Sequence, residues 1–326
     1  MAHPTPIKTI HGQHCHHGWN HANAPVETVT PGTTLSFECQ DAAGGYFTRE
    51  AKAADVATMP FEHLNPVTGP IFVDGAQPGD ILKVTINEFR PSGFGWTAII
   101  PGFGLLHDQF TSPALFLWDY DTSTRTPAAY ASQARIPMKP FAGTIGLAPA
   151  AAGTHSIVPP RRIGGNLDIR DLSAGSTLYL PVEVVGGLFS IGDTHAAQGD
   201  GEVCGTAIES AMTASVTLDL IKDTPLAMPR FSTPGPVTRH LDGAGYEVFT
   251  GIGPDLMTGA RQAVEGAIDW LGKSRNMPAE QAYVLCSVCG DLRISEIVDA
   301  PNWVVSFYLW VSSRYGTRGA MWDNKR

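Results

Sequence analysis

Residues 81–89 read ILKVTINEF, and this stretch shows the pattern that decides the fold. Leu82, Val84 and Ile86 alternate with polar residues, so an extended chain would place them on one face. Similar alternation recurs in residues 33–39, 177–185 and 215–220, and Gly, Pro, Asp and Asn separate the segments. Short strands without long helical patterns between them predict a mainly β fold of sandwich-like or barrel-like modules.

The period of the apolar residues changes after about residue 246. Leu256, Val264, Ile268 and Leu271 share one helical stripe, which predicts an amphipathic helix. A second helix is expected to begin near Pro278, and residues 303–310 return to strand composition. We therefore predict a smaller C-terminal α+β part, packed on the β-rich portion.

This change of pattern divides the chain into three parts. Residues 24–245 form the predicted β-rich catalytic core, and residues 246–326 form the α+β part. Residues 1–23 are rich in histidine, and we expect a solvated arm there. Metal capture, or coverage of a neighbouring subunit's site, is the alternative role for its cluster of His11, His14, Cys15, His16, His17 and His21.

Composition excludes several classes of function. The chain has 326 residues, 35 of them Gly and 25 Pro, with a net charge of −9. Such a charge argues against a nucleic-acid or anionic-membrane partner. The sequence has no apolar run of the roughly 20 residues that span a bilayer and no basic leader, so we expect a cytoplasmic protein. Five sparse cysteines indicate reduced thiols rather than a disulfide framework.

Residues 188–209, LFSIGDTHAAQGDGEVCGTAIE, gather the residues most able to carry chemistry. Asp193 and His195 are two apart, so on an extended segment they share a face and can bind one divalent ion. Asp200 and Glu202 repeat that spacing, and an acidic β-turn is the structural alternative. Asn166 and Asp168, within GGNLD at 164–168, also share a face, where a capped turn is the simpler interpretation.

These motifs resemble the acetamidase/formamidase family of metal-associated, β-rich amidases. The resemblance rests on GDTHAAQGDGEVCG at 192–205, which is long and specific. Shorter segments support it in the family's order: NPVTGPI at 65–71, GAQPGD at 75–80, FAGTIGLAP at 141–149, GGNLD at 164–168 and GDLRI at 290–294. It covers about residues 24–308. By itself, residues 65–71 read as a turn that leads into a strand.

The resemblance implies a hydrolase that converts a short aliphatic amide, such as formamide or acetamide, to a carboxylate and ammonia. A metal-activated water would perform the attack. On this basis Asp168, Asp193 and His195 are the expected ligands of a divalent cation, with zinc expected first and calcium, manganese or iron as alternatives. The resemblance also implies a homo-oligomer.

The remaining site residues receive roles from the same hypothesis. Glu202 is the expected general base and Asp200 its orienting or proton-donating neighbour, although these two carboxylates and the ligands can exchange places. Asn166 would donate to the substrate oxygen. Asp41, within QDAAGGY at 40–46, either closes the site on the substrate or forms a simple turn.

Three alternatives stay open at this stage. Cys204 near Glu202 permits a thiolate mechanism, although a buried structural cysteine is the simpler interpretation. The substrate can instead be a longer amide, urea or a urea derivative. A β-sandwich module holding a structural calcium without catalysis is the third, and His195 argues against it because calcium prefers oxygen ligands. Cys286 and Cys289 have redox spacing but fall within a predicted helix.

Overall fold

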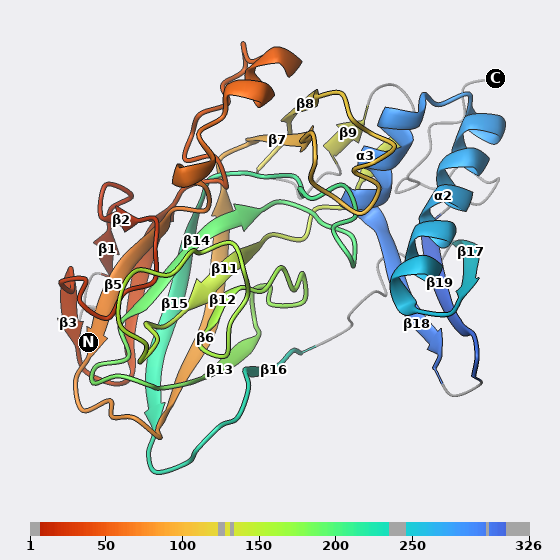
Figure 1. Cartoon of the computed structure of the whole chain (residues 1–326). Helices are drawn as coiled ribbons and strands as arrows, with labels where there is room; N and C mark the ends of the chain where they lie inside the picture. Colours follow the sequence, from red (N-terminus) through yellow and green to blue (C-terminus); the bar gives the residue numbers. More distant parts are fainter. Residues whose placement is uncertain (1–6, 123–127, 131–133, 235–245, 298–299, 311–326) are drawn as a thin grey trace.

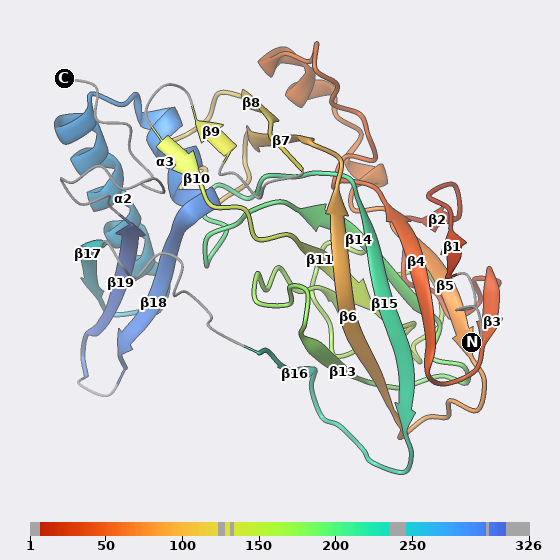
Figure 2. The same cartoon turned by 180° about the vertical axis from the view of Figure 1, so that it is seen from behind.

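Two six-stranded sheets pack face to face in the computed structural model, which describes residues 7–122, 128–130, 134–234, 246–297 and 300–310 (Figures 1 and 2). The first sheet has the order β1 (Lys8–Ile10), β4 (Thr33–Cys39), β15 (Met212–Ile221), β6 (Ile81–Pro91), β13 (Thr177–Pro181) and β16 (Arg230–Ser232). The second has the order β12 (Gly164–Asn166), β11 (Phe141–Gly146), β14 (Phe189–His195), β5 (Val67–Val73) and β2 (Cys15–His16), with β3 (Glu27–Val29) also paired to β5. The predicted mainly β, sandwich-like fold is confirmed.

The alternating residues of the sequence build the core between these sheets. Leu35 and Phe37 of β4, and Leu82 and Val84 of β6, are fully buried. Phe37 meets Phe189 of β14 edge to face, with ring centroids 5.7 Å apart, so the contact joins the two sheets. Burial of each such side chain stabilises the fold by roughly 1.5–3 kcal/mol.

The strand that we expected over residues 177–185 is shorter in the structure. β13 ends at Pro181, which lies opposite Ile81 at the end of the pairing with β6. Proline lacks the N–H that a ladder requires, so the strand stops there.

A second hydrophobic cluster lies beside the sandwich. The hairpin of β7 (Phe94–Ile99) and β8 (Ala114–Asp119) packs with the short helix η1 (Ala53–Thr58), and a second short helix, η2 (Phe61–His63), follows η1 in the chain. β9 (Ala128–Tyr130) and β10 (Ala134–Ile136) pair nearby. Trp96 of β7 forms a backbone bridge with Glu209, which brings this cluster next to the end of β14.

The C-terminal part contains two helices and a three-stranded sheet, drawn in blue in Figure 1. Its strands have the order β17 (Tyr246–Gly253), β19 (Trp303–Trp310) and β18 (Gly290–Glu296). α2 (Leu256–Arg275) starts after Asp255, whose side chain accepts from the Thr258 N–H, and its apolar stripe packs against this sheet as predicted. α3 (Ala279–Cys289) begins directly after Pro278, also as predicted.

No helix in the described ranges has the length and apolar character needed to cross a bilayer.

Residues 7–23 differ from the solvated arm that we expected. β1 pairs in parallel with β4, β2 pairs with β5, and Trp19 is buried. His16 donates and accepts through two 2.9 Å contacts, to the Gly18 carbonyl and the Ser190 hydroxyl. Edge pairing and burial of Trp19 therefore tie this segment to the sandwich.

Candidate active site

A cavity of about 340 Å³ opens beside one end of the second sheet, where the predicted acidic residues converge. β14 ends with Asp193 and His195, and Asp168 follows β12. Metal-binding atoms of Asp168, Asp193 and His195 lie within 4.8 Å of one another, and so do those of His195, Glu202 and Glu209. Met59, Phe61, Leu64, Trp96, Ile100, Phe103 and Val158 supply apolar walls. The structure thus joins four carboxylates and one imidazole in a single pocket.

β11 explains why residues distant in sequence meet there. Thr144 lies opposite both Asn166 of β12 and Gly192 of β14, so β11 holds the two site-bearing strands side by side. Gly143 leaves the room for their side chains. A Cβ on Gly143 would lie 2.6 Å from Asp168 Oδ1 and 2.8 Å from His195 Cε1, which is closer than atoms can pack.

The orientation of His195 is fixed from one side. Gln198 donates through Nε2 to the Asp168 carbonyl at 2.8 Å, so its Oε1 faces His195 Nδ1 at 2.9 Å and accepts from it. With the proton on Nδ1, His195 Nε2 is the ring atom that faces Asp193 Oδ1 at 3.2 Å and Glu209 Oε2 at 3.1 Å. This arrangement is typical of a histidine that binds a metal through Nε2.

A hydrogen-bond network holds Asp193 in place. Asn65 Nδ2 donates to Asp193 Oδ2 at 2.9 Å, and the Thr144 hydroxyl lies 3.0 Å from the same oxygen. Asn166 Oδ1 accepts from Asn65 and Thr144, and Asn166 Nδ2 donates to the Val158 carbonyl. Asp193 Oδ2 therefore accepts from the Asn65 amide and competes with Asn166 Oδ1 for the single Thr144 hydroxyl proton, while Asp193 Oδ1 faces His195.

Burial and crowding shift the pKa values of three carboxyl groups and of the imidazole in the pocket. Burial raises the pKa of Asp168 to about 7. Burial also raises the pKa of Glu209, and that of Glu202 well above its usual range, with neighbouring carboxylates adding to the effect. Burial opposes protonation of His195, but Glu209 and Asp193 outweigh it and raise the pKa of His195. The pocket concentrates negative charge that a cation would relieve.

The residues present fit a divalent cation. Asp168 Oδ1 and Glu209 Oε2 are buried and make no hydrogen bond within the described part of the chain. Buried charged oxygens of this kind are normally paired or metal-bound. Carboxylates with one imidazole suit zinc, manganese or iron.

The backbone of the site is strained. Asn65, Asp168, Asp193 and Glu202 have φ of 52°, 49°, 50° and 42°, which is the left-handed region that L-residues with side chains rarely adopt. They are four of seven such non-glycine residues in the described ranges. Strain of this sort concentrates at functional sites, where it aims side chains.

Two further residues that we expected near the substrate do not line the cavity. Asp200 instead lies 3.2 Å from Arg170 Nε, so its side chain faces an ion pair outside the pocket. Asp41 is buried and accepts from the N–H groups of Ala43 and Gly45, so it shapes the turn that presents Ala42 to the cavity. Asn166, by contrast, lines the pocket as expected.

Cys204, Cys286 and Cys289 are buried. Cys204 contacts the Ala98 and Thr206 carbonyls through sulfur, and burial raises the pKa of its thiol. Cys286 and Cys289 are buried in α3, and burial raises the pKa of both. A thiolate at neutral pH is therefore disfavoured at all three positions.

Sequence reasoning missed two residues of the cluster. Glu209 lies fourteen positions after His195 yet bridges to it, because the chain turns back beside β14. A charged residue between Ala207-Ile208 and Ser210-Ala211 was the available signal, since buried glutamates need a partner. Asn65 read as part of a turn, and only the fold places its amide on Asp193.

One family of known proteins matches most of this chain. The profile of the Acetamidase/Formamidase family matches residues 5–157 and 150–312. The chain belongs to this family.

Individual relatives of this acetamidase/formamidase chain match over part of their length. A formamidase of Methylophilus methylotrophus is 30% identical over 134 residues, which are 39% of this chain and 31% of the relative. An acetamidase of Mycolicibacterium smegmatis is 29% identical over 118 residues, 32% of this chain and 29% of the relative. The alignments thus span about a third of these curated relatives.

Two solved structures match this chain over more than nine-tenths of its length. A gamma lactamase from Delftia acidovorans superposes with a TM-score of 0.84 at 26% identity, covering 91% of this chain and 88% of the other. An acetamidase from Bacillus halodurans superposes with a TM-score of 0.66 at 29% identity, covering 92% of this chain and 96% of the other.

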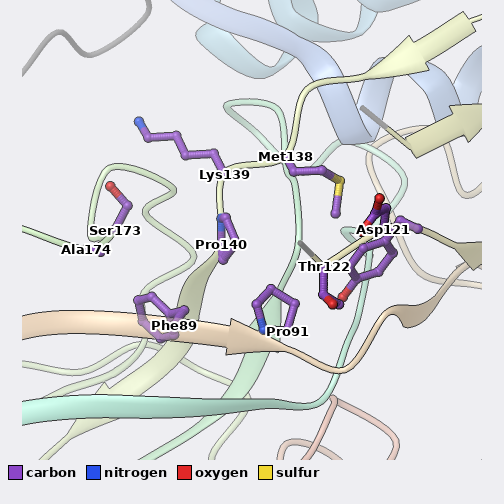
Figure 3. A pocket seen from close by; sticks show the side chains of 10 residues that line it. Phe89, Pro91, Asp121, Thr122, Met138, Lys139, Pro140, Ser173 and Ala174 are labelled. Atoms are coloured by element: carbon purple, nitrogen blue, oxygen red, sulfur yellow. The ribbon is translucent and has the colours of Figure 1, made fainter. Parts of the chain in front are cut away.

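Another cavity, of about 230 Å³, is lined in part by residues 138–140, which lead into β11. Figure 3 shows it with Asp121 and Met138 on one side and Ser173 and Ala174 on the other. Lys139 at its edge pairs with Asp171. The converging carboxylates and His195 lie in the first cavity, which is therefore the candidate active site.

Proposed function

We propose that this protein hydrolyses the C–N bond of a carboxylic amide, releasing a carboxylate and ammonia. The observation that carries the proposal is an apolar-walled pocket that ends on His195 and four carboxylates. Relatives named formamidase and acetamidase favour formamide or acetamide as the substrate class.

Four residues would hold a divalent cation: Asp168, Asp193, His195 and Glu209. Asp168 Oδ1 is buried without a hydrogen bond in the described part of the chain, and Asp193 Oδ1 and Glu209 Oε2 lie 3.2 and 3.1 Å from His195 Nε2. These positions support the assignment, and the imidazole favours zinc. A cation bound there would polarise the amide carbonyl and lower the pKa of a bound water.

Glu202 is the proposed general base. Its side chain is half-buried at the pocket. Burial and the neighbouring Asp168 carboxyl group raise the pKa of Glu202 although His195 lowers it, so Glu202 has a high proton affinity. Glu202 takes a proton from the attacking water and returns it to the amide nitrogen, so the C–N bond breaks with ammonia as the leaving group. Asn166 uses one N–H on Val158 and retains a second for the substrate oxygen.

The test combines substrate, metal and one matched pair of variants. Ammonia release from formamide and acetamide should be lost on chelation and restored by zinc or manganese. Glu202→Gln should lower kcat by about 10²–10⁴-fold with bound metal retained. Glu62→Gln changes an exposed glutamate in η2 and should leave kcat unchanged. Full activity of Glu202→Gln would remove the assigned base.

A cyclic amide is the second candidate substrate. The gamma lactamase superposes with a higher TM-score than the acetamidase, 0.84 against 0.66. One water molecule occupies roughly 30 Å³ of the liquid, so a cavity of about 340 Å³ has room for a molecule larger than acetamide, which has four non-hydrogen atoms. Ring opening of 2-pyrrolidinone forms an amino acid without ammonia, so an assay for primary amine separates the two substrates. No amine formation would exclude this lactam.

Location and assembly complete the proposal. All five cysteines are free thiols, which supports a cytoplasmic location. Exposed apolar side chains on the C-terminal part support a homo-oligomer, among them Val248, Ile252, Met257 and Ile294.

A further inference from the structure

Arg170 lies at a buried junction between the sandwich and the C-terminal part. Its Nη1 and Nη2 atoms donate to the two oxygens of Asp291 in β18, the second at 2.8 Å. Arg170 and Asp291 are 6% and 1% exposed, so the pair is shielded from solvent. Arg170 Nε also lies 3.2 Å from Asp200. One guanidinium therefore joins two carboxylates from separate segments.

Hydrogen bonds from α3 and β18 hold the backbone that leads to Glu202. Gly199 N–H donates to the Ser287 carbonyl of α3 at 2.7 Å, and Leu292 N–H of β18 donates to the Asp200 carbonyl at 3.0 Å. Asp200 N–H also donates to Asp291 Oδ1 at 3.2 Å. A Cβ on Gly199 would lie 1.9 Å from the Gly290 carbonyl oxygen, so the two backbones touch.

The sequence spacing makes this junction relevant to the pocket. Arg170 is two residues after Asp168, and Asp200 is two residues before Glu202. Asp168 and Glu202, which line the cavity, therefore lie on short segments that the same ion pair joins. Glu202 has a left-handed φ of 42°, which needs support from surrounding structure.

We propose that Arg170 and Asp291 are positioning residues, through which α3 and β18 hold the Glu202 segment at its working distance from Asp168. The inference rests on the proposed function, because that function assigns Glu202 and Asp168 their roles. This inference gives the C-terminal part a role at the active site, although none of its described residues, 246–297 and 300–310, lines the cavity. A buried ion pair that serves stability alone is the competing explanation.

Asp291→Asn tests the proposal with Asp80→Asn as the matched control. Asp80 is 2% exposed, pairs with Lys222 beside the ends of β6 and β15, and does not line the pocket. Both variants therefore weaken a buried or half-buried acid–base pair. The readouts are kcat and KM for amide hydrolysis, bound metal, and hydrogen–deuterium exchange of residues 199–205.

Asp291→Asn should lower kcat about 10- to 100-fold with KM within about twofold, because small displacements of a catalytic group have effects of this size. Exchange in residues 199–205 should rise in this variant and stay unchanged in Asp80→Asn. Asp200→Asn, whose side chain is half-exposed, should show the same pattern more weakly and serves if Asp291→Asn does not fold.

The outcomes separate this inference from the proposed function. Unchanged exchange of residues 199–205 together with wild-type kcat in the Asp291→Asn variant would overturn the inference. Equal effects of Asp80→Asn and Asp291→Asn on kcat would also overturn it, because stability alone would then explain them. Raised exchange in Asp291→Asn, with a wild-type protein that hydrolyses no amide, would support the positioning while refuting amide hydrolysis.

Discussion

Gly143→Ala tests the proposed cation site with a single methyl group. The added Cβ would lie 2.6 Å from Asp168 Oδ1, 2.8 Å from His195 Cε1 and 2.9 Å from His195 Nε2. Real Cβ contacts stay above 3.0 Å, so Asp168 and the imidazole must each shift by several tenths of an ångström. His195 has little room, since Phe141 packs edge to face on its ring and Gln198 holds Nδ1.

Displacement of metal ligands or of their supporting groups typically lowers metal affinity 10- to 100-fold, and we expect a loss of that size. Calorimetric titration of metal-free protein with zinc or manganese measures it, and ammonia release should fall in parallel. Gly266→Ala in α2 is the control, because its Cβ would meet Phe249 at an ordinary 3.6 Å. Wild-type zinc and manganese affinity in the Gly143→Ala variant would refute the assigned ligand set.

Three other changes probe the pocket wall, the thiol and the N-terminal segment. Phe103→Ala should lower kcat/KM for benzamide about tenfold and leave acetamide unaffected, because only the larger acyl group reaches this half-exposed ring; equal losses would argue against a wall contact. Cys204→Ala should keep kcat within about threefold, and iodoacetamide should not inactivate the wild type, since burial disfavours the thiolate. Burial lowers the pKa of His16 to about 4, so the unfolded chain takes up the proton first, and stability falls by up to about 3 kcal/mol as pH drops from 6.5 to 4. Urea unfolding at both pH values should show a smaller drop for His16→Asn than for the wild type; equal drops would exclude His16 as the source.

Local periodicity predicted the fold well where burial is one-sided. Alternation over 33–39 and 81–89 became β4 and β6, and the apolar stripe after residue 255 became α2. The N-terminal histidines misled because composition says nothing about edge pairing, whereas β1 and β2 are held by backbone hydrogen bonds to β4 and β5. Backbone pairing depends on register, which a single segment does not encode.

The candidate site was predicted in its motif and only partly in its members. Asp193 and His195 share a face of β14, as their spacing required, and Asp168 and Glu202 join them. Spacing failed for Asp200 because Gly201 and Glu202 have positive φ, which breaks the two-residue alternation. Glu209 enters through a chain reversal, and long-range pairing of this kind leaves no periodic trace in the sequence.

The left-handed residues around the pocket lower the stability of the protein, and one of them is the proposed general base. A residue with a Cβ costs about 1–2 kcal/mol more than glycine in this conformation, so Glu202→Gly would relieve strain while deleting the proposed base. Such a variant would be a more heat-resistant but inert protein. Asn276, left-handed at the end of α2 and outside the pocket, offers the same relief without that loss. Selection for thermal stability alone would therefore favour glycine at pocket positions such as Glu202 and would remove catalytic groups. A stabilising glycine substitution should instead be tried first at Asn276.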